Sequence, residues 1–328
     1  MTNLHLSGGA QARRYLSMVI AALLALILAA CDPSPKPLLR IGTNIWPGYE
    51  PLYLARSLGY YEPLPIRLVE MTSTSEVLHA LHSSTLEGAA LTLDEALSAI
   101  GEGSDLKIIL IMDFSNGGDA LLAKPSIASL EQLRGKRIAV EYTAVGAILL
   151  DSALQAAGLT VTDVQINSCQ AGNHLKCYAD ADAVVTFEPI LSQLLNRGAK
   201  RLFDSSRIPD RIVDVLVVRE SAGESHRETI KTLVKGYFDA LLYQQQSPAD
   251  AAERMAPRLG VAAGEVGDAF AGIRQPSLEE NRALLSGHPS PMELQAQQLA
   301  TFLEQRKLLK QAPTTNHLTS ARYLPDER

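Results

Sequence analysis

Ile41-Gly-Thr-Asn-Ile-Trp-Pro-Gly-Tyr-Glu-Pro-Leu-Tyr-Leu-Ala-Arg-Ser-Leu-Gly-Tyr-Tyr61 is the stretch that decides the fold of this 328-residue chain. It begins inside a short apolar segment, residues 38–42, that has the composition of a β-strand. A helical pattern follows at residues 49–58, and Gly59 can end that helix because glycine readily adopts the left-handed conformation of a C-cap. A strand that leads directly into a helix predicts an α/β architecture.

Outward from this stretch, strand and helix patterns alternate along the chain. Strands are expected at residues 66–69, 88–91, 106–112, 136–140, 161–166, 183–185, 200–203 and 213–219. Helices are expected at residues 75–82, 94–100, 145–157, 190–196, 228–243, 249–259 and 293–309. This alternation predicts two doubly wound α/β halves with a helical C-terminal tail. The expected boundaries are lobe 1 at residues 39–119, lobe 2 at 120–212, a return to lobe 1 with the C-terminal helices at 213–310, and a flexible tail at 311–328.

The N-terminus has the pattern of an export signal. Arg13 and Arg14 precede an apolar run at residues 15–30. That run is shorter than the roughly 20 residues that cross a bilayer core, so residues 1–30 are expected to be a cleaved signal peptide and not a membrane span. Residues 31–38, which are rich in proline, are expected to form a stiff linker.

Leu28-Ala-Ala-Cys31 resembles a bacterial lipobox, which implies that Cys31 is diacylated and becomes the first residue of the mature protein. The acyl chains then hold the domain at the membrane by burying methylene groups at about 0.8 kcal/mol each. Asp32 resembles the inner-membrane retention signal of enteric lipoproteins. These resemblances imply a location on the periplasmic side of the inner membrane, or at the cell surface if the organism has a single membrane. The alternative is a free or buried cysteine at the end of the signal.

Composition excludes one class of partner. The formal net charge is −6, and removal of the two basic residues in positions 1–30 leaves −8. Because a polyanion is bound by a basic surface, a nucleic-acid partner is not expected. Hydrophobic residues make up 46% and charged residues 20% of the chain, which is ordinary for a globular protein.

The remaining cysteines and histidines offer little for catalysis or metal binding. Cys169 and Cys177 are eight positions apart in an exported chain, so they are expected to form either a local disulfide or two buried thiols. Cys169 with His174 could act as nucleophile and base, but the disulfide is the better role for this cysteine. His79 and His82 share a helix face without a third ligand. Because the chain also lacks G-x-S-x-G, Walker and H-E-x-x-H motifs, neither an enzyme nor a cofactor or metal site is expected.

Several blocks together resemble a known family. They are the stretch from Ile41 to Tyr61, Gly135-Lys-Arg-Ile-Ala-Val-Glu141, Asp182-Ala-Val-Val-Thr-Phe-Glu-Pro189 and the lipobox. The chain resembles the extracytoplasmic solute-binding proteins of ABC importers, in the branch for taurine, aliphatic sulfonates, nitrate and thiamine-pyrimidine precursors. The resemblance implies a two-lobed type II periplasmic binding fold, a small solute bound between the lobes, and delivery to permease and ATPase subunits by a monomer. A ligand sensor or scaffold with the same fold is the alternative.

The polar residues after the predicted strands are candidates for ligand contact, because ligands of open α/β sheets bind at the carboxyl ends of strands. The candidates are Asn44, Trp46, Tyr49, Thr72, Ser73, Ser75, Thr92, Asp94, Asp113, Ser115, Asn116, Glu141, Tyr142, Thr143, Phe187 and Glu188. Helix ends offer a second role for some of these residues. Trp46 and Tyr49 can staple a helix start, and the hydroxyl residues can cap helices, which is the better expectation for Thr92.

The carboxylates among these candidates disfavour an anionic ligand. Asp94, Asp113, Glu141 and Glu188 repel a sulfonate or nitrate, and no arginine stands at a strand end to bind one. The sequence therefore predicts a neutral or cationic nitrogen-containing ligand, packed by Trp46, Tyr142 and Phe187. The alternative is that some of these carboxylates point to solvent or hold the lobes together.

Overall fold

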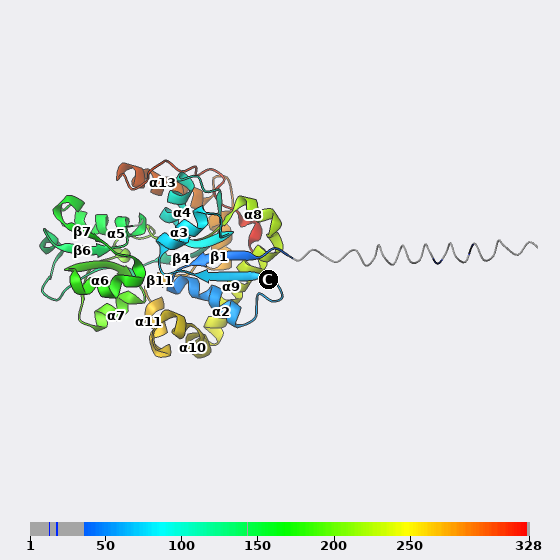
Figure 1. The fold of residues 1–328 in the computed structure, drawn as a ribbon, viewed down its shortest axis with the longest axis horizontal. Coiled ribbons are helices and arrows are strands. Elements are labelled where there is room, and N and C mark those ends of the chain that lie inside the picture. The colour runs from blue at the N-terminus through cyan, green and yellow to red at the C-terminus, as the bar shows by residue number, and fades with distance from the viewer. Residues whose placement is uncertain (1–12, 14–17, 19–35, 143, 327–328) are drawn as a thin grey trace, which may run out of the picture. The chain divides into compact units, whose positions relative to one another are not determined.

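Two mixed β-sheets covered by helices make up the unit Pro37–Arg328 (Figure 1). The computed structural model describes residues 13, 18, 36–142 and 144–326. The predicted roles of Cys31 and Thr143, and most of the predicted signal peptide and linker, lie outside the described residues.

The first sheet combines strands from both ends of the unit. Its strands, in spatial order, are β11 (Ile273–Arg274), β4 (Leu106–Ser115), β10 (Val213–Arg219), β3 (Gly88–Thr92), β1 (Leu39–Thr43) and β2 (Ile66–Glu70). Strand β1 runs parallel to β2 and β3, whereas β10 is antiparallel to both β3 and β4. Strand β10 therefore begins at the edge where β3 ends, with Asp214 paired to Thr92.

Helices accompany this first sheet to form lobe 1. They are η1 (Pro47–Tyr49), α2 (Glu50–Ser57), α3 (Thr74–His82), α4 (Leu93–Gly101), α8 (Glu220–Ser225), α9 (Arg227–Gln246), α10 (Pro248–Leu259), η6 (Ala263–Glu265), α11 (Val266–Phe270), α12 (Leu278–Leu285), α13 (Pro291–Gln305) and η7 (Ala321–Tyr323).

The second sheet, with its helices, forms lobe 2 (Figure 1). Its strands, in spatial order, are β7 (Gln165–Ser168), β6 (Arg137–Val140), β8 (Ala183–Phe187), β5 (Asp119–Ala123) and β9 (Lys200–Asp204). Its helices are η2 (Leu130–Leu133), α5 (Ala144–Gln155), η3 (Val161–Asp163), η4 (Ala171–Asn173), α6 (His174–Asp180), α7 (Ile190–Asn196) and η5 (Ser205–Arg207). Strand β5 is antiparallel to β8, so it begins at the edge where β8 ends.

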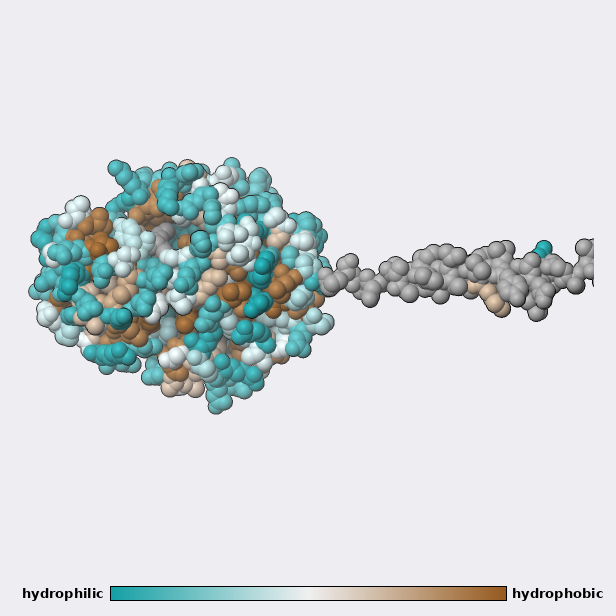
Figure 2. All heavy atoms as spheres, in the orientation of Figure 1, coloured by the Kyte–Doolittle hydropathy of each residue, from teal (hydrophilic) through white to brown (hydrophobic). Residues whose placement is uncertain are grey.

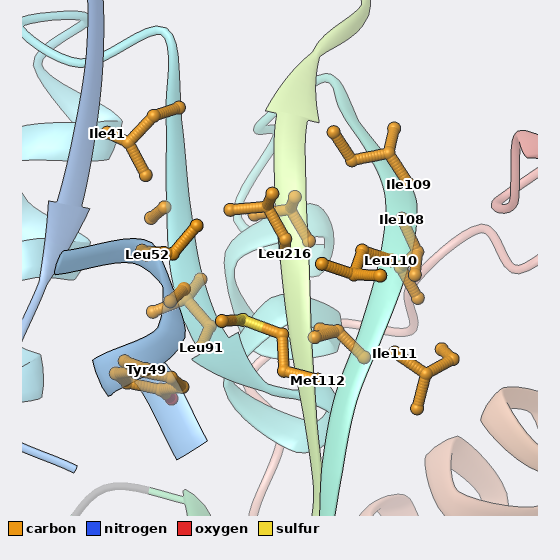
Figure 3. Close-up of a cluster of buried hydrophobic side chains, with 14 of the residues drawn as sticks. Ile41, Tyr49, Leu52, Leu91, Ile108, Ile109, Leu110, Ile111, Met112 and Leu216 are labelled. Carbon is orange, nitrogen blue, oxygen red and sulfur yellow. The ribbon is translucent and has the colours of Figure 1, made fainter. Parts of the chain in front are cut away.

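The core of lobe 1 explains why its central strands are continuous apolar runs. Helices cover both faces of the sheet, so every residue of β3 and nearly every residue of β4 and β10 is buried. Figure 3 shows Ile41, Leu91, Leu216 and the β4 side chains Ile108 to Met112 in this core, with Tyr49 and Leu52 beside them.

The chain passes from one sheet to the other between β4 and β5 and again between β9 and β10. The first crossing is residues 116–118, where Gly117 has a φ of +107°, a conformation that favours glycine. The amide N–H of Gly117 donates a 2.7 Å hydrogen bond to the hydroxyl of Ser205, at the start of the second crossing. The two crossings are thus tied together.

Two predicted elements and the predicted tail differ from the structure. The strand expected at 161–166 splits into η3 and β7, because the Asp163 carboxylate accepts the Thr160 N–H at 2.9 Å and forms a turn. The last long helix ends at Gln305, four residues early. The tail was expected to be flexible throughout, but Leu318 and Tyr323 are buried.

The tail packs there because the first half of β4 has a free edge. Strand β11 pairs only with Phe114 and Ser115 of β4. At the other end of β4, the Ile108 N–H donates to the carbonyl of Leu318 at 2.8 Å, and the Ser320 N–H donates to the carbonyl of Ile108 at 2.9 Å. Burial of an unpaired strand edge would leave its backbone groups unsatisfied, and the tail supplies their partners.

The surface of the unit is mainly hydrophilic on the face in view. Figure 2 shows hydrophobic residues there in small separate groups. Within the described ranges, no helix has both the length and the apolar character needed to cross a membrane.

Candidate functional site

Two small adjoining cavities lie between the lobes. The first, of about 30 Å³, is lined by Asn44, Trp46, Tyr49, Thr74, Thr92, Glu95, Asp119, Val145, Phe187 and Asp214. The second, of about 20 Å³, is lined by Thr74, Asp119, Val140, Glu141, Val145, Gly146, Leu149, His174, Val185 and Phe187. Four lining residues are common to both cavities, and both lobes contribute side chains to each.

The wall from lobe 1 is built on the turn after β1. The indole N–H of Trp46 donates to Asp113 at 3.0 Å, and the hydroxyl of Tyr49 donates to Asp214 at 2.5 Å. Gly48 lets this turn approach the sheet, because a Cβ at this position would lie 1.7 Å from the Asp113 carboxylate. Trp46 and Tyr49 thus line the cavity and donate hydrogen bonds to carboxyl groups, so their role is not limited to packing at the start of the helix.

The start of α4 adds hydroxyl and carboxyl groups. Thr92 is the N-cap residue, and its N–H donates to the Glu95 carboxylate at 3.0 Å. The Thr92 hydroxyl has no hydrogen-bond partner among the described residues, although it is buried beside the cavity. The same holds for one oxygen of Glu95 and for both oxygens of Asp94, within the part of the chain that the structure describes.

The wall from lobe 2 comes from the facing ends of β5 and β8. Asp119 and Phe187 are paired in the ladder. The hydroxyl of Ser115 donates to the Asp119 carboxylate at 2.5 Å. The Phe187 ring meets Trp46 edge to face, with ring centroids 5.9 Å apart, so an aromatic contact joins the two lobes.

A disulfide shapes the loop beneath the second cavity. It joins Cys169 and Cys177, whose Cα atoms are 6.6 Å apart, so Cys169 has no free thiol for catalysis. His174, between them, places Nε2 3.2 Å from the carbonyl of Cys169 and Nδ1 3.1 Å from the hydroxyl of Thr186. A carbonyl can only accept, so Nε2 carries the proton, and burial lowers the pKa of His174. His174 is therefore a neutral ring in the wall.

Glu141 connects the lobes. Its carboxylate accepts the N–H of Ser75 at 3.1 Å and the Ser75 hydroxyl at 2.6 Å, both from lobe 1. It also accepts the N–H of Ala171 in lobe 2 at 2.8 Å. Next to it, the Gly172 N–H donates to the carbonyl of Thr72 at 3.1 Å. Glu141 thus has the lobe-joining role that the sequence left as an alternative.

Replacing Glu141 with glutamine is expected to loosen the contact between the lobes. Glutamine offers one acceptor oxygen where the carboxylate offers two, and its amide would meet a backbone donor, at a cost of about 1–3 kcal/mol. Small-angle scattering of the ligand-free protein should then give a larger radius of gyration. Glu188→Gln is the matched control, because Glu188 accepts an N–H and a hydroxyl from Ser192 within lobe 2. An unchanged radius for Glu141→Gln would contradict this role.

Several predicted residues lie away from the cavities. Ser73 caps α3 by accepting the Glu76 N–H, and Asn116 is exposed in the crossing. Asp113 and Asp94 are buried behind the wall, and Tyr142 is 46% exposed. With Ser75, Tyr142 lines a separate outer cavity of about 600 Å³ that reaches Glu95. Tyr142 is therefore not part of the lining of the two inner cavities.

Burial dominates the electrostatics of the inner site. It raises the pKa of Asp94, Asp113 and Asp119 to about 7 and that of Glu95 to about 8. It also raises the pKa of Asp214 well above its usual range, with further contributions from Asp113 and other nearby carboxylates. Among the described residues that line the two cavities there is no arginine or lysine.

Sequence reasoning missed four residues that line the first cavity, namely Thr74, Glu95, Asp119 and Asp214. Asp119 and Asp214 lie at or near the starts of antiparallel strands, whereas the pattern that predicted ligand contacts applies to the ends of strands. An acidic residue at the start of a strand that follows an interlobe crossing is the signal that could have found them.

Among the described residues, no group of three or more His, Cys, Asp or Glu side chains is placed so that it could hold a metal ion.

Comparison with known proteins gives concordant results. A sequence model of the NMT1-like family matches residues 32–260. The taurine-binding periplasmic protein of Escherichia coli (strain K12) is 27% identical over 173 residues, which are 51% of this chain and 54% of that protein. The match thus spans about half the length of that relative.

Solved structures share the whole architecture. The alkanesulfonate-binding protein SsuA from Xanthomonas axonopodis pv. citri, bound to MOPS, has a TM-score of 0.69 and 18% identity, covering 86% of this chain and 97% of that one. The desulfurization enzyme DSZB has a TM-score of 0.62 and 17% identity, covering 87% and 97%. At this identity the likeness concerns the fold alone, and it confirms the predicted two-lobed α/β fold of periplasmic binding proteins.

Proposed function

Because this chain belongs to the NMT1-like family, we propose that it is the solute-binding component of an ABC import system. One observation carries the proposal: both lobes build the wall of the same cavity, Trp46 and Tyr49 from one and Asp119 and Phe187 from the other. A solute held there contacts both lobes at once. It therefore stabilises the arrangement in which the lobes are together.

Access to this site requires the lobes to separate. A cavity of about 30 Å³ has room for a water molecule or two and not for a drug-sized ligand. The crossings at residues 116–118 and 205–212 are the places where the dihedral angles of a hinge can change. Solute binding then proceeds by hinge closure, without bond making or breaking.

The lining supports a nitrogen-containing solute. The E. coli relative and SsuA are named for taurine and alkanesulfonate binding, and a sulfonate group is best held by arginine or lysine. The described lining has neither, and it presents the carboxyl groups of Glu95, Asp119 and Asp214. A ligand that donates hydrogen bonds or carries positive charge suits this lining.

The fold by itself does not separate binding proteins from enzymes, since DSZB has it as well. The binding role is supported by the described lining of the two cavities, which contains no serine, cysteine or lysine nucleophile. In this proposal a permease and an ATPase receive the solute. Lipid attached to Cys31 anchors the monomer on the periplasmic side of the membrane.

A thermal-shift screen tests the binding role. Purified protein is heated with taurine, methanesulfonate, nitrate, primary amines, pyrimidines or amino acids. A solute that binds only the native state adds about 2.7 kcal/mol of stability at a hundredfold excess over its Kd. We expect an amine or a nitrogen heterocycle to raise Tm, and scattering at saturation to show a smaller radius of gyration.

Other outcomes bear on separate parts of the proposal. A hit that leaves the radius of gyration unchanged contradicts hinge closure. No hit in any class contradicts solute binding. A ligand sensor with the same fold would share the binding step, so uptake of the hit by cells with and without the protein distinguishes transport from sensing.

A further inference from the structure

Two buried carboxyl groups share a proton behind the cavity wall. Asp113 and Asp214 are register partners on the neighbouring strands β4 and β10, and each is at most 2% exposed. Two carboxyl groups that are buried side by side without a cation between them cannot both be ionised, so the pair holds a proton in common. Trp46 and Tyr49 each donate to one member of the pair, and Asp214 lines the cavity.

Titratable groups on the surrounding elements reinforce the negative character of this pair. Glu95 and Asp94 are on α4, Asp119 on β5, Tyr49 on η1 and Tyr237 on α9. Tyr237 cannot carry a positive charge, and its hydroxyl donates to the carbonyl of Met112 at 2.9 Å. The described lining contributes no cationic side chain to offset these groups.

The site also has acceptors without donors. Glu95 lines the first cavity, is 2% exposed, and has one carboxylate oxygen with no hydrogen-bond partner in the described part of the chain. A buried carboxyl oxygen without a donor is costly, so such an oxygen facing a binding site indicates a ligand that donates. Trp46, Tyr49 and Phe187 supply the aromatic walls that attract a cation.

The second cavity differs from the first in chemistry. Beyond the shared residues, its wall includes the apolar side chains of Val140, Leu149 and Val185. The polar groups there are His174, which is neutral, and Glu141, whose carboxylate already accepts hydrogen bonds from Ser75 and Ala171. A ligand that spans both cavities therefore has a charged end at the carboxyl groups and a compact apolar end.

We propose that the solute is a small organic cation, an amine or a protonated nitrogen heterocycle, whose positive group replaces the proton shared by Asp113 and Asp214. One positive charge enters the site and one proton leaves to the solvent, so the charge of the site is unchanged. This inference rests on the proposed function, because it assigns the charge of the ligand to the same cleft. Burial raises the pKa of Asp113 to about 7, so the exchange falls in the neutral range.

Titration calorimetry with three compounds that share a propyl group tests the charge of the preferred ligand. The full chain is titrated with propylamine, 1-propanol and 1-propanesulfonate at pH 7. We expect propylamine to bind at least tenfold more tightly than 1-propanol, and the sulfonate not to bind. Because the buffer takes up the released proton, the binding enthalpies of propylamine in phosphate and in Tris should differ by the difference between the ionisation enthalpies of the two buffers, for each proton released. Its affinity should rise about tenfold per pH unit between pH 5.5 and 6.5.

Three variants test which carboxyl groups are responsible for propylamine binding and for proton release. Asp113→Asn keeps an acceptor for the Trp46 indole but removes the shared acid, so propylamine binding should weaken at least tenfold and proton release should disappear. Glu95→Gln leaves the pair intact, and it should weaken binding while proton release remains. Asp180→Asn, an exposed residue of α6, is the control and should change neither.

The outcomes separate this inference from the proposed function. Preference for 1-propanesulfonate, or equal binding of 1-propanol, overturns the cationic ligand and leaves solute binding intact. Propylamine binding without proton release overturns the exchange. If none of the three probes binds, the inference is overturned, while the broader thermal-shift screen decides the binding role.

Discussion

Replacing Arg258 with methionine is expected to lower the free energy of unfolding by about 3–5 kcal/mol, measured by denaturant unfolding at pH 8. The Arg258 guanidinium forms an ion pair with Glu50, and their side chains are 11% and 0% exposed. It also donates to Glu70 at 2.6 Å and to the carbonyl of Asn44 at 2.9 Å. The guanidinium carbon lies 3.6 Å from the centre of the Tyr53 ring.

The large loss of stability expected for Arg258→Met comes from the buried Glu50 carboxyl that remains without its partner. Without Arg258, Glu50 is a buried carboxyl that has lost its ion-pair partner, and breaking a buried pair in this way costs far more than breaking an exposed one. Burial already raises the pKa of Glu50 to about 7, against the lowering influence of Arg258. At pH 5 Glu50 is protonated, so the cost of the substitution should be smaller there.

Two further variants test this reasoning. Glu50→Gln in the Arg258→Met background removes the stranded charge and should recover a substantial part of the lost stability. Arg254→Met, one turn earlier in α10, breaks an exposed pair with Asp250 and should cost less than about 1 kcal/mol. Equal losses for Arg258→Met and Arg254→Met would contradict the buried-pair account.

The ligand-free protein is expected to become less stable as the pH rises from 5 to 7.5. Burial raises the pKa values of Glu50, Asp94, Asp113 and Asp119 to about 7 and that of Glu95 to about 8. Each group therefore keeps its proton in the folded protein over a range where the unfolded chain has lost it. Its contribution to stability is complete below about pH 4 and is lost as the pH rises through the folded pKa.

The expected magnitude is large because several groups act in the same direction. Each contributes a slope of up to about 1.4 kcal/mol per pH unit. His174 opposes them, because a lowered histidine pKa favours the folded state as the pH rises towards 6.5. Carboxylates with lowered pKa values, such as Glu87 and Glu280, act only at lower pH.

Differential scanning calorimetry across this range checks the prediction. Tm should fall by several degrees, at about 2 °C per kcal/mol for a domain of this size. Asp119→Asn should make the decline shallower, whereas Asp180→Asn, an exposed carboxyl in lobe 2, should leave it unchanged. A Tm that is constant or rises between pH 5 and 7.5 would show that the buried carboxyls are not held protonated by the fold.

Local patterns predicted much of the fold. The helix at Ile190–Asn196 and the strand at Val213–Arg219 have the predicted bounds, because an apolar period and its flanking breakers are local properties of the chain. The prediction of one strand at residues 161–166 was wrong, because a hydrogen bond from the Thr160 N–H to the Asp163 side chain competes with strand formation. The tail at residues 311–328 was predicted to be flexible, but part of it packs on β4, a strand that is far away in the sequence.

The sequence by itself determined the α/β class, the first strand and helix, and the placement of Asn44, Trp46 and Tyr49 at a strand end, since these follow from periodicity over a few residues. Only the tertiary structure decided which carboxyl groups meet. Asp214 and Asp119 reach the cleft because β10 and β5 run antiparallel to their neighbours, and Glu141 joins the lobes because α3 starts opposite it. Strand direction and register between distant segments are set by the packing of the whole unit, and no local pattern in the chain carries them.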